Sequence, residues 1–112
     1  MLSIDALKEY GADVESGLAR CMGNEAFYLR MVGLALEDAH FDQLFESIEA
    51  GDVKAGFDHA HALKGVLGNL ALTPIFDPMD ELTEILRAGD EADPDVVEEI
   101  KEAFAALKEI GK

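Results

Sequence analysis

The sequence predicts an all-α fold, namely an antiparallel four-helix bundle with short extra N-terminal helices. Residues that start and end helices recur along the chain, whereas the apolar–polar alternation that indicates strands is nearly absent. Four longer stretches carry apolar residues at helical spacing, and the short connections between them favour antiparallel neighbours. With 112 residues the chain can bury one core without disulfide or metal support, so we expect a single domain over residues 1–112.

Two short helices are expected first. Ser3 can cap a helix over about residues 4–9. Asp13 can cap a second helix over residues 14–22, which Gly23 would end.

A longer helix follows Asn24, its expected N-cap. Its stretch EAFYLRMVGLALE places one stripe of apolar residues on a single face: Phe27, Met31, Leu34 and Ala35. The stretch EDAHFD, residues 37–42, should bend or break this helix before the pattern resumes at Leu44, Phe45 and Ile48. Gly51 and Asp52 then read as a C-cap followed by an N-cap.

The central helix is expected from Val53 to about Leu72, where Pro74 ends it. Because a proline inside a helix costs about 3 kcal/mol, we expect residues 73–77 to form a turn. Asp77 would cap the next helix, with Pro78 as its first residue.

The last helix has the same start signal, in Asp93 and Pro94. Its sequence DVVEEIKEAFAALKEI contains a continuous apolar stripe: Val97, Ile100, Phe104, Leu107 and Ile110. This stripe should face the core of the bundle.

The charge argues against two classes of partner. The net charge of −15, from 24 acidic and 9 basic residues, disfavours nucleic acid and anionic membrane surfaces, which attract Lys and Arg.

The N-terminal stretch MLSIDALKEY is unlike a signal peptide, and no apolar run approaches 18 residues. Since the only cysteine, Cys21, cannot form an internal disulfide, we expect a cytoplasmic protein.

The central helix has two different faces on a helical wheel of about 100° per residue. One set of residues falls within roughly 60° of His61: Lys54, Phe57, Asp58, Lys64, Gly65 and Gly68. The opposite set should face the core: Gly56, His59, Leu63, Val66, Leu67 and Leu70. His59 and His61 therefore point in directions about 200° apart and cannot chelate one metal ion.

His61 is the candidate reactive residue, whereas His59 is expected to be partly buried, neutral and hydrogen-bonded. An exposed imidazole is a competent nucleophile at neutral pH. A phosphoryl group on His61 would gain from the ammonium of Lys64 one turn away, and Lys54 would add to this effect. Gly65 and Gly68 each cost roughly 1 kcal/mol in a helix, which suggests that a partner needs the space beside the ring.

The segment His61–Gly65, HALKG, resembles the HxLKG signature of histidine phosphotransfer (HPt) domains. The following GNL is similar to the family's small-residue and Asn-Leu/Ile segment. The resemblance extends from about Gly11 to Ile110 and includes the stretch GADVESGLAR, the GD before the central helix and two amphipathic helices after it. One departure is Ala71, where the family often has glycine; it lies about 280° from His61 on the wheel.

The resemblance implies a phosphorelay intermediate. His61 would accept a phosphoryl group from the aspartate of a receiver domain and pass it to another receiver, with Lys64 stabilising the transferred oxygens. Gly65 and Gly68 would admit the partner. The docking face for the receiver would also include Phe57, Asp58 and Lys54.

No nucleotide-binding motif is present, so we expect neither kinase nor phosphatase activity. The expected partners are response-regulator receiver domains, with a hybrid histidine kinase as a further candidate. We expect a monomer without a cofactor or metal of its own, and Mg²⁺ on the receiver.

Two alternatives remain. The spacings Glu37-x-x-His40 and Asp58-x-x-His61 imitate those of metal-binding carboxylate bundles, although Lys54 and Lys64 would repel a cation at the second. The other alternative is a non-catalytic, acidic helical-bundle interaction module that uses the same face only for docking.

Overall fold

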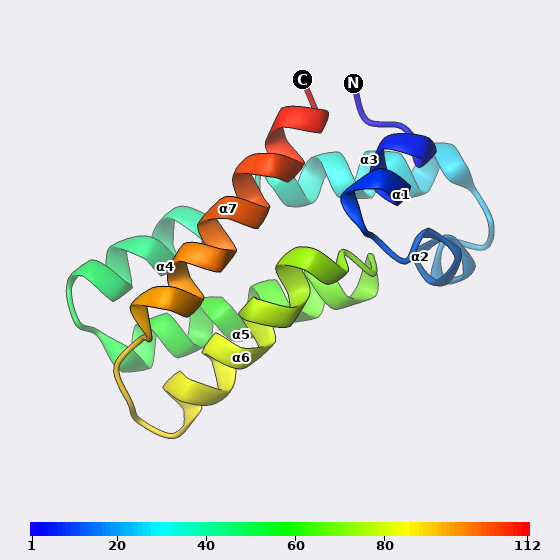
Figure 1. Cartoon of the computed structure of the whole chain (residues 1–112). Helices are drawn as coiled ribbons and strands as arrows, with labels where there is room; N and C mark the ends of the chain where they lie inside the picture. The colour runs from blue at the N-terminus through cyan, green and yellow to red at the C-terminus, as the bar shows by residue number, and fades with distance from the viewer.

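A computed structural model describes all residues, 1–112, and contains seven α-helices (Figure 1). In chain order they are α1 (Ile4–Tyr10), α2 (Val14–Arg20), α3 (Glu25–Leu36), α4 (His40–Glu49), α5 (Val53–Asn69), α6 (Thr73–Arg87) and α7 (Pro94–Ile110). The all-α prediction is therefore confirmed. None of the helices has the length and apolar character that a membrane span requires.

The predicted N-caps begin the helices as expected. In each case a side-chain oxygen accepts a hydrogen bond from a backbone N–H near the start of the helix, and the capping residues are Ser3, Asp13, Asn24, Asp52 and Asp93. The expected break after α3 is also present. Gly51 has a φ of 71°, which lets the chain reverse between α4 and α5.

The predicted start of α6 is wrong. The helix begins at Thr73, five residues before Pro78, which lies inside the helix and is buried. Ile75 and Met79 lie four residues apart, on either side of the proline in the sequence, so they point to the same face of the helix. Both are fully buried. Each buried side chain of this size contributes about 1.5–3 kcal/mol, which offsets the cost of about 3 kcal/mol for the proline.

The expected apolar stripe of α3 is also wrong in part. Phe27 and Leu34 are 47% and 51% exposed, whereas Tyr28 and Val32 are fully buried. Of the predicted stripe, Ala35 is buried, and Met31 is partly buried against the core. The core face of α3 thus lies about one residue further along the chain, a rotation of about 100°.

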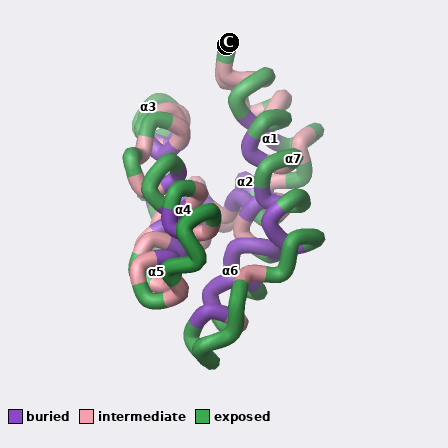
Figure 2. The backbone as a smooth tube through the Cα atoms, turned by 90° about the vertical axis from the view of Figure 1, so that its left-hand side faces the viewer, coloured by how far each residue is buried: buried purple, intermediate pink, exposed green.

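One core of 22 buried hydrophobic residues lies between the helices. Figure 2 shows the buried residues along the facing sides of α4 to α7, with the exposed residues on their outer sides. The central helix α5 packs chiefly against α6 and α4, and α6 also packs against α7. This arrangement leaves one side of α5 open to solvent.

The end of α5 forms a tight cap with an unusual residue. The N–H of Ala71 donates to the carbonyl of Gly68, and the N–H of Leu72 donates to the carbonyl of Leu67. This pattern is a Schellman motif, in which the residue after the C-cap adopts the left-handed conformation and is usually glycine. Ala71 occupies that position here, with a φ of 55°.

Candidate functional site

The orientation of α5 agrees with the helical wheel in its main features. Its buried residues are Gly56, Ala60, Leu63 and Leu67, and His61 is exposed on the opposite side. His59 is partly buried, as expected, whereas Val66, which was expected in the core, is only half-buried at its edge. No hydrogen bond connects either ring nitrogen of His59 to another residue, so the expected bond is absent.

His61 opens onto a shallow depression, which we call the His61 hollow. Its lining residues are Arg20, His61, Lys64, Gly65, Gly68, Asn69 and Phe76. Most of them lie on α5, but Arg20 comes from α2 and Phe76 from α6. The guanidinium of Arg20 donates to the backbone carbonyl of Gly68 at 2.5 Å and thereby ties α2 to the end of α5.

The ring of His61 packs on a neighbouring aromatic ring. Its centroid lies 5.6 Å from that of Phe57, one turn earlier on α5, and the two planes differ by 19°. The guanidinium carbon of Arg87, on α6, lies 4.9 Å from the centroid of Phe57. Phe57 thus contacts both the imidazole of His61 and a cation, and each of these contacts favours particular orientations of its ring.

Lys64, whose ammonium is expected to stabilise a phosphoryl group on His61, is bound by two carboxylates. Its Nζ lies 2.7 Å from Oδ1 of Asp80 and 3.6 Å from Oε1 of Glu84, both on α6. The hydrogen bond to Asp80 raises the pKa of Lys64 above its ordinary value, and Glu84 adds to this effect. The ammonium therefore stays charged throughout the physiological range.

The two glycines beside His61 differ in their surroundings. A Cβ atom on Gly65 would meet no other atom within 4 Å, so this position is open to solvent as expected. A Cβ atom on Gly68 would lie 2.9 Å from Cε1 of Phe76. The expectation of open space at Gly68 is therefore wrong, because the ring of Phe76 occupies it.

The remaining predicted residues of this face, Lys54 and Asp58, are exposed, and neither forms an ion pair. Basic residues are few in this acidic chain. Four of the nine lie on or next to this face: Arg20, Lys54, Lys64 and Arg87. Carboxylates offset part of this positive charge, because Asp80 and Glu84 bind Lys64 and Glu84 also binds Arg87.

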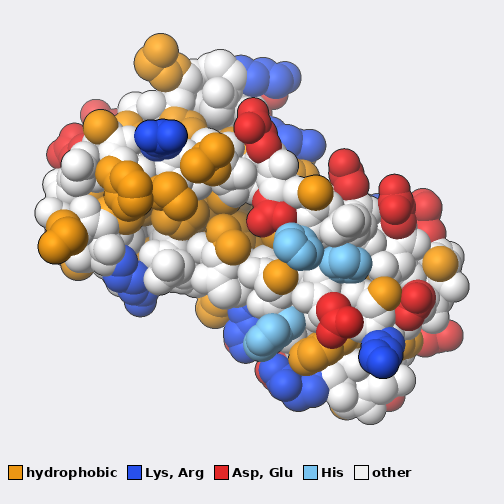
Figure 3. Space-filling model, turned by 180° about the vertical axis from the view of Figure 1, so that it is seen from behind, with side chains coloured by type: hydrophobic (Ala, Val, Ile, Leu, Met, Phe, Trp, Pro, Cys, Tyr) orange, Lys and Arg blue, Asp and Glu red, His pale blue; other side chains and the backbone are white.

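Figure 3 shows the face of the molecule that carries the three histidines, with acidic side chains gathered towards one end and apolar ones towards the other. The rings of His40 and His59 lie 5.4 Å apart, and Nδ1 of His40 lies 2.7 Å from Oδ1 of Asp38. No group of three or more His, Cys, Asp or Glu side chains is placed to hold a metal ion. The arrangement that a carboxylate-bundle metal site requires is therefore missing.

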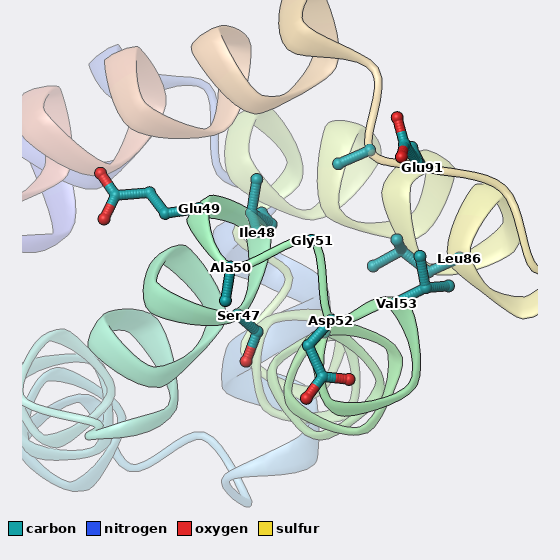
Figure 4. A pocket seen from close by; sticks show the side chains of 11 residues that line it. Ser47, Ile48, Glu49, Ala50, Gly51, Asp52, Val53, Leu86 and Glu91 are labelled. Atoms are coloured by element: carbon teal, nitrogen blue, oxygen red, sulfur yellow. The ribbon is translucent and has the colours of Figure 1, made fainter.

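A second hollow, of about 250 Å³, lies near the turn between α4 and α5 (Figure 4). Its polar side chains include Ser47 and Asp52, but both serve the local structure. The Ser47 hydroxyl donates to the carbonyl of Gln43, and the Asp52 carboxylate caps α5. This hollow contains neither a cation nor a histidine, so it offers no comparable chemistry.

Several residues around His61 were not predicted from the sequence: Arg20, Asn69, Phe76, Asp80, Glu84 and Arg87. The spacing of Asp80, Glu84 and Arg87 places them on one face of α6, which is a signal in the sequence. That spacing alone did not show which neighbouring helix they face. For Arg20 and Phe76 the sequence contains no comparable signal.

Comparison with protein-family models gives one match. The model described as Hpt domain matches residues 29–110, from the middle of α3 to the end of α7. Among curated proteins and among solved structures, no chain matches.

Proposed function

Because the chain belongs to the Hpt domain family, we propose that His61 carries a phosphoryl group between the aspartates of receiver domains. Hpt domains are phosphotransfer carriers of phosphorelay signalling, and they work with receiver domains and histidine kinases. Beyond family membership, we propose the identity of the phosphorylated residue, the direction of transfer and the roles of the surrounding side chains.

The observation that carries the proposal is the exposure of His61 at the His61 hollow, next to Lys64 and the bare backbone of Gly65. His40 and His59 are only half-exposed, and they lie against each other rather than beside a cation. His61 thus combines an accessible ring with a nearby ammonium and with room for a partner. Phosphoryl transfer depends mainly on positioning and on electrostatic stabilisation of the transferred oxygens.

In the proposed step, the lone pair of one His61 ring nitrogen attacks the phosphorus of the receiver's phospho-aspartate. The N–P bond forms while the P–O bond to the aspartate breaks, and the bonding electrons leave with the carboxylate. The proton on the other ring nitrogen stays in place. Transfer to a second receiver reverses these bond changes.

The proposed step requires no cofactor bound to this chain. Mg²⁺ would bind to the carboxylates of the receiver and would neutralise charge on the transferred oxygens. On this chain, Lys64 would contact the same oxygens after transfer, and Phe57 would orient the imidazole through the stack. The proposal places the reaction in the cytoplasm, in agreement with the single free cysteine, Cys21.

The test is transfer from a receiver that carries radioactive phosphate on its aspartate. The domain should take up a label that acid removes and base does not, as a phosphoramidate should behave. His61→Gln should abolish this uptake. His59→Gln is the matched control on the same helix and should retain it, whereas label that persists in His61→Gln would refute the assignment.

A docking-only interaction module is the second candidate, because the same exposed face would serve it. Such a module would bind receivers without taking up label. Measuring binding and uptake on the same receiver distinguishes the two functions.

A further inference from the structure

The carboxylates of α6 bind the one cation that lies a single turn beyond His61. Asp80 and Glu84 are one turn apart on α6, which packs directly against α5. The 2.7 Å contact of Asp80 with Lys64 is the shorter of the two, and Glu84 lies 3.6 Å from the same ammonium. Glu84 also binds Nε of Arg87 at 3.1 Å through its second oxygen.

This geometry has a consequence for the phosphorylated state. An ammonium group has three N–H donors and no acceptor, so Lys64 must divide them between carboxylates and phosphoryl oxygens. A phosphoryl group on His61 would carry up to two negative charges and would compete with Asp80 for Lys64. When Lys64 turns from Asp80 to the phosphoryl group, its ion pair with Asp80 is weakened. The cost of weakening that ion pair reduces the net stabilisation of the phosphoryl group on His61.

We infer that Asp80 is a positioning residue that competes with the phosphoryl group for the N–H donors of Lys64. By this competition Asp80 sets how readily His61 gives up its phosphoryl group. Asp80 acts through Lys64 and does not touch the reacting atoms. Glu84 supports the same arrangement and connects it to Arg87, whose guanidinium covers the ring of Phe57. The inference rests on the proposed function, since it concerns the phosphorylated state of His61.

The test compares Asp80→Asn with the wild-type domain in equilibrium with a phosphorylated receiver. Because exposed ion pairs are weak, freeing Lys64 should shift the equilibrium towards phosphorylated His61 by about two- to fivefold. Glu81→Gln is the matched control, since it removes one charge from an exposed residue of α6 that forms no ion pair. Asp80→Glu keeps the carboxylate and should restore behaviour close to wild type.

A double variant shows whether the effect passes through Lys64. In the Lys64→Gln background, Asp80→Asn should change the equilibrium no more than Glu81→Gln does. An effect of equal size with and without Lys64 would mean that Asp80 repels the phosphoryl group directly, and this would overturn the inference. An unchanged equilibrium in Asp80→Asn alone would overturn it as well.

A measurement without a receiver separates this inference from the proposed function. Phosphoramidate can phosphorylate an exposed histidine directly, with release of ammonia, and His61→Gln gives the background signal. A ³¹P NMR titration of the phosphorylated domain reports the second ionisation of the phosphoryl group. Freeing Lys64 favours the dianion, so the titration midpoint in Asp80→Asn should fall by about 0.3–0.7 pH units, the same two- to fivefold effect. If receivers fail to transfer, the proposed function fails, whereas an unchanged midpoint refutes only the role of Asp80.

Discussion

Alanine substitutions at Gly65 and Gly68 should differ in their effect on stability, although both positions lie on the same side of α5: only the first should stabilise the domain. Alanine favours a helix interior by about 1 kcal/mol over glycine. At Gly65 no atom lies within 4 Å of the added Cβ, so Gly65→Ala should realise this gain. The melting temperature should rise by about 4 °C in a domain of this size.

At Gly68 the same gain meets a packing cost. The added Cβ would lie 2.9 Å from Cε1 and 3.3 Å from Cδ1 of Phe76. Favourable carbon contacts begin near 3.5 Å, so the ring must retreat by about 0.6 Å. Overpacking of this kind costs about 1–3 kcal/mol, which makes Gly68→Ala neutral to about 2 kcal/mol less stable than wild type.

Thermal and denaturant unfolding of the two variants, measured side by side, tests this difference. Equal stabilisation in both would show that Phe76 moves aside without cost, and the packing argument would then fail. Gly65→Gln extends the test to function. Glutamine is a good helix former, so this variant should fold at least as well as wild type. Its side chain would stand one turn from His61 and should slow transfer from a receiver, and an unchanged transfer rate would show that docking does not need this space.

Three further predictions concern the fold. Ala71→Gly should stabilise the domain by about 0.5–1 kcal/mol in denaturant unfolding, because it relieves the left-handed conformation but adds entropy to the unfolded chain; transfer should not change. Gly17→Ala should destabilise the domain by about 1–3 kcal/mol in the same assay, because the added Cβ would lie 2.5 Å from the ring of Tyr28. A variant as stable as wild type would contradict the close packing of Tyr28 against Gly17. Burial raises the pKa of both Tyr10 and Tyr28, so the folded state retains protons that unfolded tyrosines lose near pH 10. Their contribution to stability should be complete below pH 10 and should decline above it, and a flat unfolding free energy from pH 9 to 11 would contradict this.

The sequence predicted the helices best where the signal is local. A cap such as Asp13 or Asn24 binds a backbone N–H three residues away, so its effect needs no other part of the chain. The outer face of α5 was also predictable. His61 and Leu63 are two residues apart, so helix geometry alone places His61 on the opposite side from the buried Leu63.

Contacts between helices were not predictable in the same way. The local rule for Pro78 was overridden by the burial of Ile75 and Met79 in a core that other helices complete. The stripe of α3 was ambiguous because apolar residues occur around most of that helix. The pairing of Lys64 with Asp80 depends on the rotation of α6 against α5, which packing determines.

The most direct test of the central claim follows the phosphoryl group through the domain. The wild-type domain is labelled by a phosphorylated receiver, separated from it and then mixed with an unphosphorylated second receiver. We expect the label to map to His61 by mass spectrometry at neutral pH and to leave the domain for the second receiver's aspartate. Label that maps to another residue, or that is released only as inorganic phosphate, would contradict a carrier function for His61.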